Sequence, residues 1–166
     1  MTNQKEKPKM KVLSNGAKQW LVDGKYHRTD GPAIERADGS KEWYGNGKLH
    51  RIDGPAFVGS DGSKLWYIDG KRHRIDGPAV ERANGLKEWL VDGKRHRIDG
   101  PAIEWADGSK EWYVGGKRHR TYGPAIEYVS GKKEFYLFGE RYVDPEVFRV
   151  AALTLVMLFP KYTTGS

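Results

Sequence analysis

The sequence predicts an all-β fold: a single-layer solenoid of β-hairpin repeats that forms one elongated antiparallel sheet, with a capping helix at its C-terminal end. Three observations support this fold class. The five histidines are spaced 23 residues apart without insertion or deletion. Short aromatic segments alternate with Asp-Gly or Asn-Gly pairs, which are typical of β-hairpin turns. The apolar segment 147–159 follows the last repeat and has no counterpart within it.

The 23-residue period indicates a repeat architecture, and one unit reads approximately ADGSKEWYVDGKRHRIDGPAIER. The histidines of the period are His27, His50, His73, His96 and His119. The tryptophans of the period are Trp20, Trp43, Trp66, Trp89 and Trp112, and Phe135 takes the next position. We interpret both sets as structural positions that recur along the array.

In the first strand of each unit, residues two apart share a face. Trp20 and Val22 lie on one such face, which we predict to be the buried apolar side. Glu42 and Tyr44 represent the opposite face, which we predict to be half exposed. The tryptophan rings of successive units are then expected to pack into one continuous core.

The rest of a unit contains a turn, a second strand and a third short segment. The pair Asp23-Gly24 predicts the hairpin turn, because both residue types tolerate positive φ. The second strand, Lys-x-His-Arg, ends at Asp-Gly-Pro, since proline removes a donor from the ladder. The third segment, Pro-Ala-Ile-Glu, adds an apolar position such as Ile34. A lone hairpin cannot bury its apolar face, so the units are expected to stack, each advancing the sheet by about 10 Å.

Four regions are predicted along the chain. Residues 1–8 form a basic tail, and residues 9–143 form the repeat array, with five full units and partial end units. Residues 144–160 form an apolar helix, because Asp144-Pro145 supplies an N-cap and a first helical position. Residues 161–166 are expected to be a disordered tail. Cysteine is absent, which excludes disulfides and Cys-ligated zinc.

The histidines are expected to have a structural role. Equivalent positions about 10 Å apart are too distant to share a zinc ion bound at about 2 Å. We therefore expect each ring nitrogen to bond the Asp-Gly-Pro turn or a neighbouring backbone carbonyl. The chain also has no nucleophile elbow or phosphate-binding loop, so we predict no catalytic residue, no metal, no cofactor and no enzymatic activity.

The net charge of +7 favours acidic partners. Arginines such as Arg28 and Arg51 recur together with Asp and Glu, so ion pairs are favoured over a track for phosphates. Arg72, Arg95 and Arg118 make units three to five more basic than the first two. If nucleic acid binds, we expect it there, with tyrosines stacking on bases.

Several motifs resemble MORN repeats: the GK-x-H step after an aromatic strand, the DGS turn and the 23-residue period. The chain is more similar to the variant MORN-like repeats of bacterial and phage proteins, through WLVDGKRHR (89–97) and IDGPAIE (98–104). The resemblance covers about residues 9–143, but arginine follows each histidine where a typical unit has glycine, and the GPA segment is extra. It implies a hairpin-repeat scaffold that binds proteins, or sometimes acidic lipids, and no catalytic activity.

We therefore expect a non-enzymatic scaffold that binds another protein, in the role of a viral or prophage accessory factor that captures or inhibits a host component. A nucleic-acid-binding protein is the alternative. No secretion signal is recognisable, so a cytoplasmic location is expected, in the host if the protein is viral. Trp105 takes a position held by arginine in other units and is expected to be exposed. The candidate binding surface comprises Tyr44, Tyr67, Arg72, Arg95, Trp105, Tyr113 and Arg118.

The C-terminal helix has two interpretations: a lid on the open edge of the sheet, which is favoured, or a contact with a partner. Because it is apolar on nearly all sides, homodimerisation through it or burial in a host protein would also follow. A membrane partner is not expected, since the flanks of the helix lack a broad basic face. The residues predicted for a partner or dimer contact are Val147, Phe148, Ala151, Leu155, Leu158 and Phe159.

Overall fold

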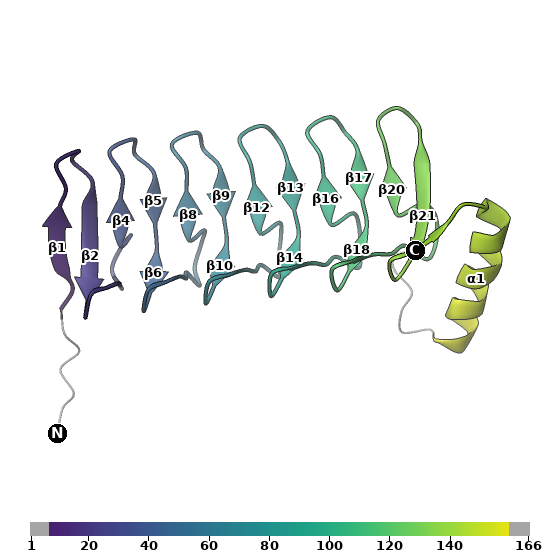
Figure 1. Ribbon diagram of the computed structural model, residues 1–166, viewed down its shortest axis with the longest axis horizontal. Helices are drawn as coiled ribbons and strands as arrows, with labels where there is room; N and C mark the ends of the chain where they lie inside the picture. Colours follow the sequence, from purple (N-terminus) through teal and green to yellow (C-terminus); the bar gives the residue numbers. More distant parts are fainter. Residues whose placement is uncertain (1–6, 160–166) are drawn as a thin grey trace, which may run out of the picture.

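The computed structural model describes residues 7–159 and shows an elongated single layer of strands with one helix at its C-terminal end (Figure 1). The predicted all-β hairpin-repeat fold with a capping helix is therefore confirmed. The predicted tail 161–166 and most of the predicted tail 1–8 lie outside the described residues.

One antiparallel sheet runs along the whole array, and its strand order follows the chain. Its strands are β1 (Lys9–Val12), β2 (Lys18–Val22), β4 (Ile34–Glu35), β5 (Lys41–Glu42), β8 (Phe57–Val58), β9 (Lys64–Leu65), β12 (Val80–Glu81), β13 (Lys87–Glu88), β16 (Ile103–Glu104), β17 (Lys110–Glu111), β20 (Ile126–Glu127), β21 (Lys133–Leu137) and β22 (Glu140–Tyr142), while β3 (Lys25–Tyr26) pairs with β2.

Four two-stranded ribbons lie beside this sheet. They are β6 (Tyr44–Gly45) with β7 (Lys48–Leu49), β10 (Tyr67–Ile68) with β11 (Lys71–Arg72), β14 (Leu90–Val91) with β15 (Lys94–Arg95), and β18 (Tyr113–Val114) with β19 (Lys117–Arg118). Their turns use the left-handed conformation that Asn, Asp and Gly tolerate, for example φ 51° at Asn46 and 79° at Gly47. The Asp-Gly and Asn-Gly pairs thus close hairpins as predicted.

The stacking element differs from the expected one. The long sheet combines the Pro-Ala-Ile-Glu segment with the start of the tryptophan strand, whereas the hairpin through the histidine strand forms the side ribbons. The tryptophan separates the two parts. The N–H of Trp43 donates to the carbonyl of Ala56 at 2.8 Å, while the carbonyl of Trp43 accepts from the N–H of His50 at 3.0 Å. Because the backbone changes partners at this residue, one predicted strand becomes two.

The buried side of the sheet is not the side predicted. Glu42, Glu88 and Glu111 are buried. Of the five repeat tryptophans, all within the described residues, only Trp112 is buried and the other four are half-buried. A continuous tryptophan core is therefore a wrong prediction. The carboxylate of Glu42 tolerates burial because it accepts hydrogen bonds from the Tyr44 hydroxyl at 2.8 Å and from Arg36 Nε at 2.7 Å.

A column of small residues forms the closest-packed part of each unit. The alanine of every Gly-Pro-Ala segment has no exposed surface, and a buried Ile or Val follows it in four of the five units. The fully buried alanines are Ala33, Ala56, Ala79, Ala102 and Ala125. Since a close-packed interior has no room for a larger side chain, alanine at this position follows from the approach of neighbouring strands.

Each tryptophan ring is covered by the arginine that lies eight residues further along the chain. The guanidinium carbons lie 3.9 to 4.2 Å from the ring centroids, within the range of cation–π contacts. These pairs are Arg28 on Trp20, Arg51 on Trp43, Arg74 on Trp66, Arg97 on Trp89 and Arg120 on Trp112. The repeat tryptophans thus pack against cations of their own unit rather than against one another.

The same arginines fix the Asp-Gly-Pro loops. In the second unit, Arg51 Nε donates to Asp53 at 2.9 Å and Nη1 donates to the carbonyl of Pro55 at 3.4 Å. The first, third and fourth units repeat both bonds, and the fifth repeats the bond to the proline carbonyl. The predicted ion pairs between these arginines and the recurring carboxylates are confirmed.

The histidines connect one unit to the next. Nδ1 of each ring accepts a hydrogen bond from the backbone N–H of the hairpin-turn residue 19 positions ahead, at 3.1 to 3.2 Å. The donors are Asn46, Asp69, Asp92, Gly115 and Phe138. The structural role expected of the histidines is confirmed. The partner differs, because it is an N–H group of the following turn rather than a carbonyl or the Asp-Gly-Pro loop.

Replacing His96 with phenylalanine tests this connection. The substitution retains an aromatic ring but leaves the N–H of Gly115 without its acceptor, so we expect it to destabilise the fold by about 1 kcal/mol. The measurement is urea unfolding followed by tryptophan fluorescence. Lys71→Gln, an exposed substitution on β11, serves as the control, and equal midpoints for the two variants would contradict the role.

A second prediction concerns acid. Hydrogen bonds from Arg28, Arg51, Arg74 and Arg97 hold the pKa values of Asp30, Asp53, Asp76 and Asp99 below the ordinary value of 3.8. A lowered pKa in the folded state stabilises it fully above the ordinary value, and this contribution is lost as the pH falls through the lowered pKa. The thermal unfolding midpoint should therefore fall between about pH 5 and about pH 3. The midpoint of the double variant Asp76→Asn/Asp99→Asn should fall less over the same pH range. An equal fall in the wild type and the variant would exclude these carboxylates as the cause.

Candidate protein-binding surface

Three isoleucines stand out along the Asp-Gly-Pro loops. Ile52, Ile75 and Ile98 are 86%, 85% and 57% exposed, and each lies between the arginine that covers a tryptophan and the aspartate that this arginine bonds. Both neighbours are held, so the isoleucine is presented from a fixed loop. We call these three residues the isoleucine row. Ile52 and Ile75 border the same hollow, and exposed apolar side chains that gather on one side of a protein are typical of an interaction site.

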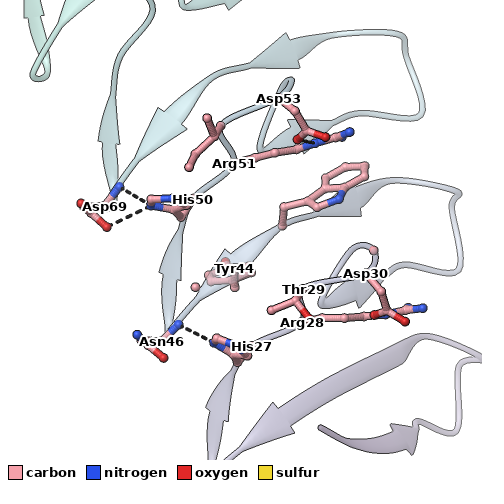
Figure 2. Close-up of a pocket in the computed structure, with 14 residues that line it drawn as sticks. His27, Arg28, Thr29, Asp30, Tyr44, Asn46, His50, Arg51, Asp53 and Asp69 are labelled. Carbon is pink, nitrogen blue, oxygen red and sulfur yellow. Dashed lines mark hydrogen bonds and ion pairs between the residues drawn. The ribbon is translucent and has the colours of Figure 1, made fainter. Parts of the chain in front are cut away.

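Hollows lie between the loops of the row. One, about 800 Å³ in volume, is lined by residues of the first and second units, among them His27, Trp43, His50 and Ile52 (Figure 2). Another, about 590 Å³, lies one unit further along, with Ile52 and Ile75 in its lining. The two hollows share several equivalent residues of successive units, among them Trp43 and Trp66.

The larger hollow contains Gly45, at a position where the other units have aliphatic side chains. Those residues are Val22, Ile68, Val91, Val114 and Leu137. The fold does not require glycine here, because Gly45 has no positive φ and an added Cβ would meet the side chain of His50 at an ordinary 3.6 Å. The missing side chain therefore leaves space that Ile68 occupies in the next hollow.

The rim of the larger hollow carries exposed carboxylates. The side chains of Asp30, Asp53 and Asp69 are 77%, 81% and 74% exposed, whereas the guanidinium groups of Arg28 and Arg51 lie against tryptophan rings and are mostly covered. Asp69 also places Oδ1 2.9 Å from Nδ1 of His50 (Figure 2). Asp30 and Asp53 are paired with these arginines, whereas Asp69 has no Arg or Lys partner among the described residues, so Asp69 is the carboxylate of the rim that a cation of a partner could pair with.

The surface predicted from sequence lies on the other side of the strands. Tyr67 pairs across the ribbon with Arg72, and Tyr113 pairs with Arg118, so each pair shares a face. Tyr44 also lies on this side, because its hydroxyl bonds the buried Glu42. The predicted grouping of tyrosines and arginines is therefore found on one face.

Two members of that group are less available than predicted. Tyr113 is buried, which is a correction, because its hydroxyl donates to Glu111 at 2.8 Å; burial and this bond raise the pKa of Tyr113. Arg118 Nε bonds the same carboxylate at 3.2 Å.

The remaining members of the predicted surface are also engaged in hydrogen bonds. Arg95 Nε bonds Glu88 at 3.1 Å, and Arg72 Nε bonds the Tyr67 hydroxyl at 3.1 Å. Trp105 is exposed as expected, with its indole N–H donating to a carboxylate oxygen of Glu111 at 3.0 Å. Arg95 and Arg118 therefore neutralise the buried glutamates Glu88 and Glu111.

The helix α1 (Pro145–Leu158) covers the C-terminal end of the sheet. Asp144 caps it by accepting from the N–H of Glu146 at 2.8 Å, as predicted. Phe148 is buried, with its ring centroid 4.9 Å from that of Phe135, so its assignment to a partner contact is wrong. Ala151 and Leu155 also pack against this cluster and are half-buried. The lid interpretation is the one the packing supports.

The outer side of α1 remains exposed. Of the predicted contact residues, Val147 lies there at 56% exposure. Leu158 and Phe159, at 65% and 52% exposure, instead line a hollow between the end of the helix and the last strands, together with Leu155. Val150, Leu153 and Met157, which were not predicted, are also exposed. None of the helices within residues 7–159 has the length and apolar character needed to cross a bilayer.

The sequence analysis missed the isoleucine row and Gly45. The available signal for the row was a β-branched apolar residue repeated between Arg and Asp-Gly-Pro, where no strand pattern requires one. The available signal for Gly45 was a single departure from an otherwise aliphatic column. Within residues 7–159 no group of three or more His, Asp or Glu side chains is arranged to hold a metal ion. No protein-family model matches the chain, and no curated protein matches it with significant similarity.

Proposed function

We propose that the protein is a non-enzymatic scaffold that binds another protein through the side carrying the isoleucine row. The observation that carries this proposal is the presentation of three exposed isoleucines at equal intervals on loops fixed by arginine. An apolar row of this kind lowers solubility unless a partner covers it. A bound partner would exclude water from all three isoleucine side chains at once.

The repeat resemblance supports the same proposal. Variant MORN-like repeats occur in bacterial and phage proteins, and the resemblance implies a binding scaffold. Within this proposal the protein acts in the cytoplasm as a viral or prophage accessory factor that captures or inhibits a host component.

A nucleic-acid partner is the second candidate, and one observation favours it. An exposed lysine begins β3, β7, β11, β15 and β19, and none of these five lysines forms an ion pair with another described residue. They are Lys25, Lys48, Lys71, Lys94 and Lys117. Binding through this row would weaken steeply as salt increases.

Capture from a host lysate tests the function with matched variants. Ile52→Ser/Ile75→Ser should lose the captured protein, while Val143→Ser, which alters a side chain 84% exposed away from the row, should keep it. Both variants should fold, because the replaced side chains are exposed. Retention by the double isoleucine variant would contradict the proposal. Capture of nucleic acid that depends on the lysines and on low salt would favour the second candidate.

Self-association through the outer side of α1 is a separate prediction. Exposed apolar residues on an end helix favour a pairing of two copies, so light scattering should give a mass above that of one chain. Leu153→Glu should return the mass to that of a single chain, because the new charge would lie in the interface. Asp144→Asn, at the helix cap, is the control, and a monomeric wild-type chain would exclude the pairing.

A further inference from the structure

We propose that the hollow at Gly45 is a socket for one branched aliphatic side chain of the partner, and that a Lys or Arg next to that side chain meets the acidic rim. This inference rests on the proposed function and specifies where and what the scaffold recognises. The socket is defined by Gly45, His27, Trp43 and His50, with Ile52 at its border.

The size of the occupant follows from a comparison within the chain. The hollow of the next unit shares several equivalent residues, among them Trp66 and His73, and has Ile68 where the first hollow has glycine. Every other unit fills this position with Val, Ile or Leu. The side chain that Gly45 lacks is therefore an aliphatic one, and the partner supplies it.

The fold itself gives no reason for the glycine. Its φ does not lie in the left-handed region, and an added Cβ would meet only the side chain of His50, at ordinary contact distances. Glycine within a strand weakens it relative to alanine. A residue that is unfavourable for folding and opens a hollow beside an exposed isoleucine is better explained by recognition.

The charge of the occupant follows from the rim. Asp30, Asp53 and Asp69 are exposed around the socket. Asp30 and Asp53 are paired with Arg28 and Arg51, so Asp69 supplies the carboxylate that lacks an Arg or Lys partner among the described residues. Opposite charge beside an apolar contact favours the correct partner and disfavours acidic ones. The partner segment is therefore aliphatic at one position and basic at the next.

Capped dipeptides provide the probes: acetyl-Leu-Arg-amide, acetyl-Leu-Glu-amide and acetyl-Gly-Arg-amide. Their binding to the full chain is followed by NMR shifts of the His27 and His50 rings and of the Trp43 indole. We expect acetyl-Leu-Arg-amide to bind about ten-fold more tightly than acetyl-Gly-Arg-amide, the gain of burying one leucine side chain. It should also bind more tightly than acetyl-Leu-Glu-amide, because glutamate is repelled by the rim carboxylates. Equal affinity of the leucine and glycine peptides would overturn the socket.

Three variants locate the site. Gly45→Val fills the socket with the chain's own side chain, should unfold at the same or a higher temperature, and should reduce leucine-peptide binding about ten-fold. Ile68→Gly should create a second socket and a second set of shifts, at His50, His73 and Trp66. Asp69→Asn, a change that the structure already accommodates at Asn46, should weaken the preference for arginine over glutamate. Unchanged binding in Gly45→Val would refute the proposal.

Lysate capture distinguishes this inference from the function on which it rests. Loss of the captured protein in both Gly45→Val and Ile52→Ser/Ile75→Ser supports the two together. Loss only in the isoleucine variant leaves the scaffold function standing and removes the socket. Capture that survives the isoleucine substitutions, combined with dipeptide binding that depends on Gly45, overturns the proposed function and keeps the socket.

Discussion

The contact between each guanidinium group and its tryptophan ring determines how a unit is built. In the second unit, Arg51 lies on Trp43 and donates to both Asp53 and the carbonyl of Pro55. The Arg51 side chain thus covers an aromatic ring and orders the Asp-Gly-Pro loop. Ile52, which lies between Arg51 and Asp53, therefore points outwards. The position of Ile52 is a direct result, because both of its neighbours are held in place.

Connection between units relies on a different group. The ring nitrogen of each histidine accepts from the turn of the following hairpin, and the glycine of that turn donates to the preceding hairpin, as Gly70 does to the carbonyl of Leu49 at 2.8 Å. Both bonds recur in all five pairs of neighbours, so each ribbon is attached although it lies outside the long sheet. His96, for example, connects its unit to the next through the N–H of Gly115.

Periodicity was enough to predict the unit, its turns and the capping helix, because each depends on local chemistry: positive φ at Asn46, or a carboxylate at the N-cap in Asp144. It was not enough to predict which side of a strand is buried. Alternation predicted that Trp43 is buried and that Glu42 is exposed. In the fold, the Glu42 carboxylate accepts hydrogen bonds from Arg36 and Tyr44, while the Trp43 ring is covered by Arg51. Arg36 and Tyr44 are both visible in the repeat pattern, but their contact with Glu42 follows only from the folded structure. The isoleucine row repeats every 23 residues, but it lies in a loop, where no strand alternation indicates whether a side chain is buried or exposed.

Because neighbouring units are joined by the same bonds throughout, a copy of any central unit could be inserted without disturbing the rest. Such duplication would lengthen the molecule in steps of about 10 Å while leaving Gly45 and α1 unaltered. The distance between the hollow at Gly45, near one end, and the exposed face of α1, at the other end, is therefore set by the number of repeat units. Variation in copy number would tune the span of the molecule independently of its local chemistry.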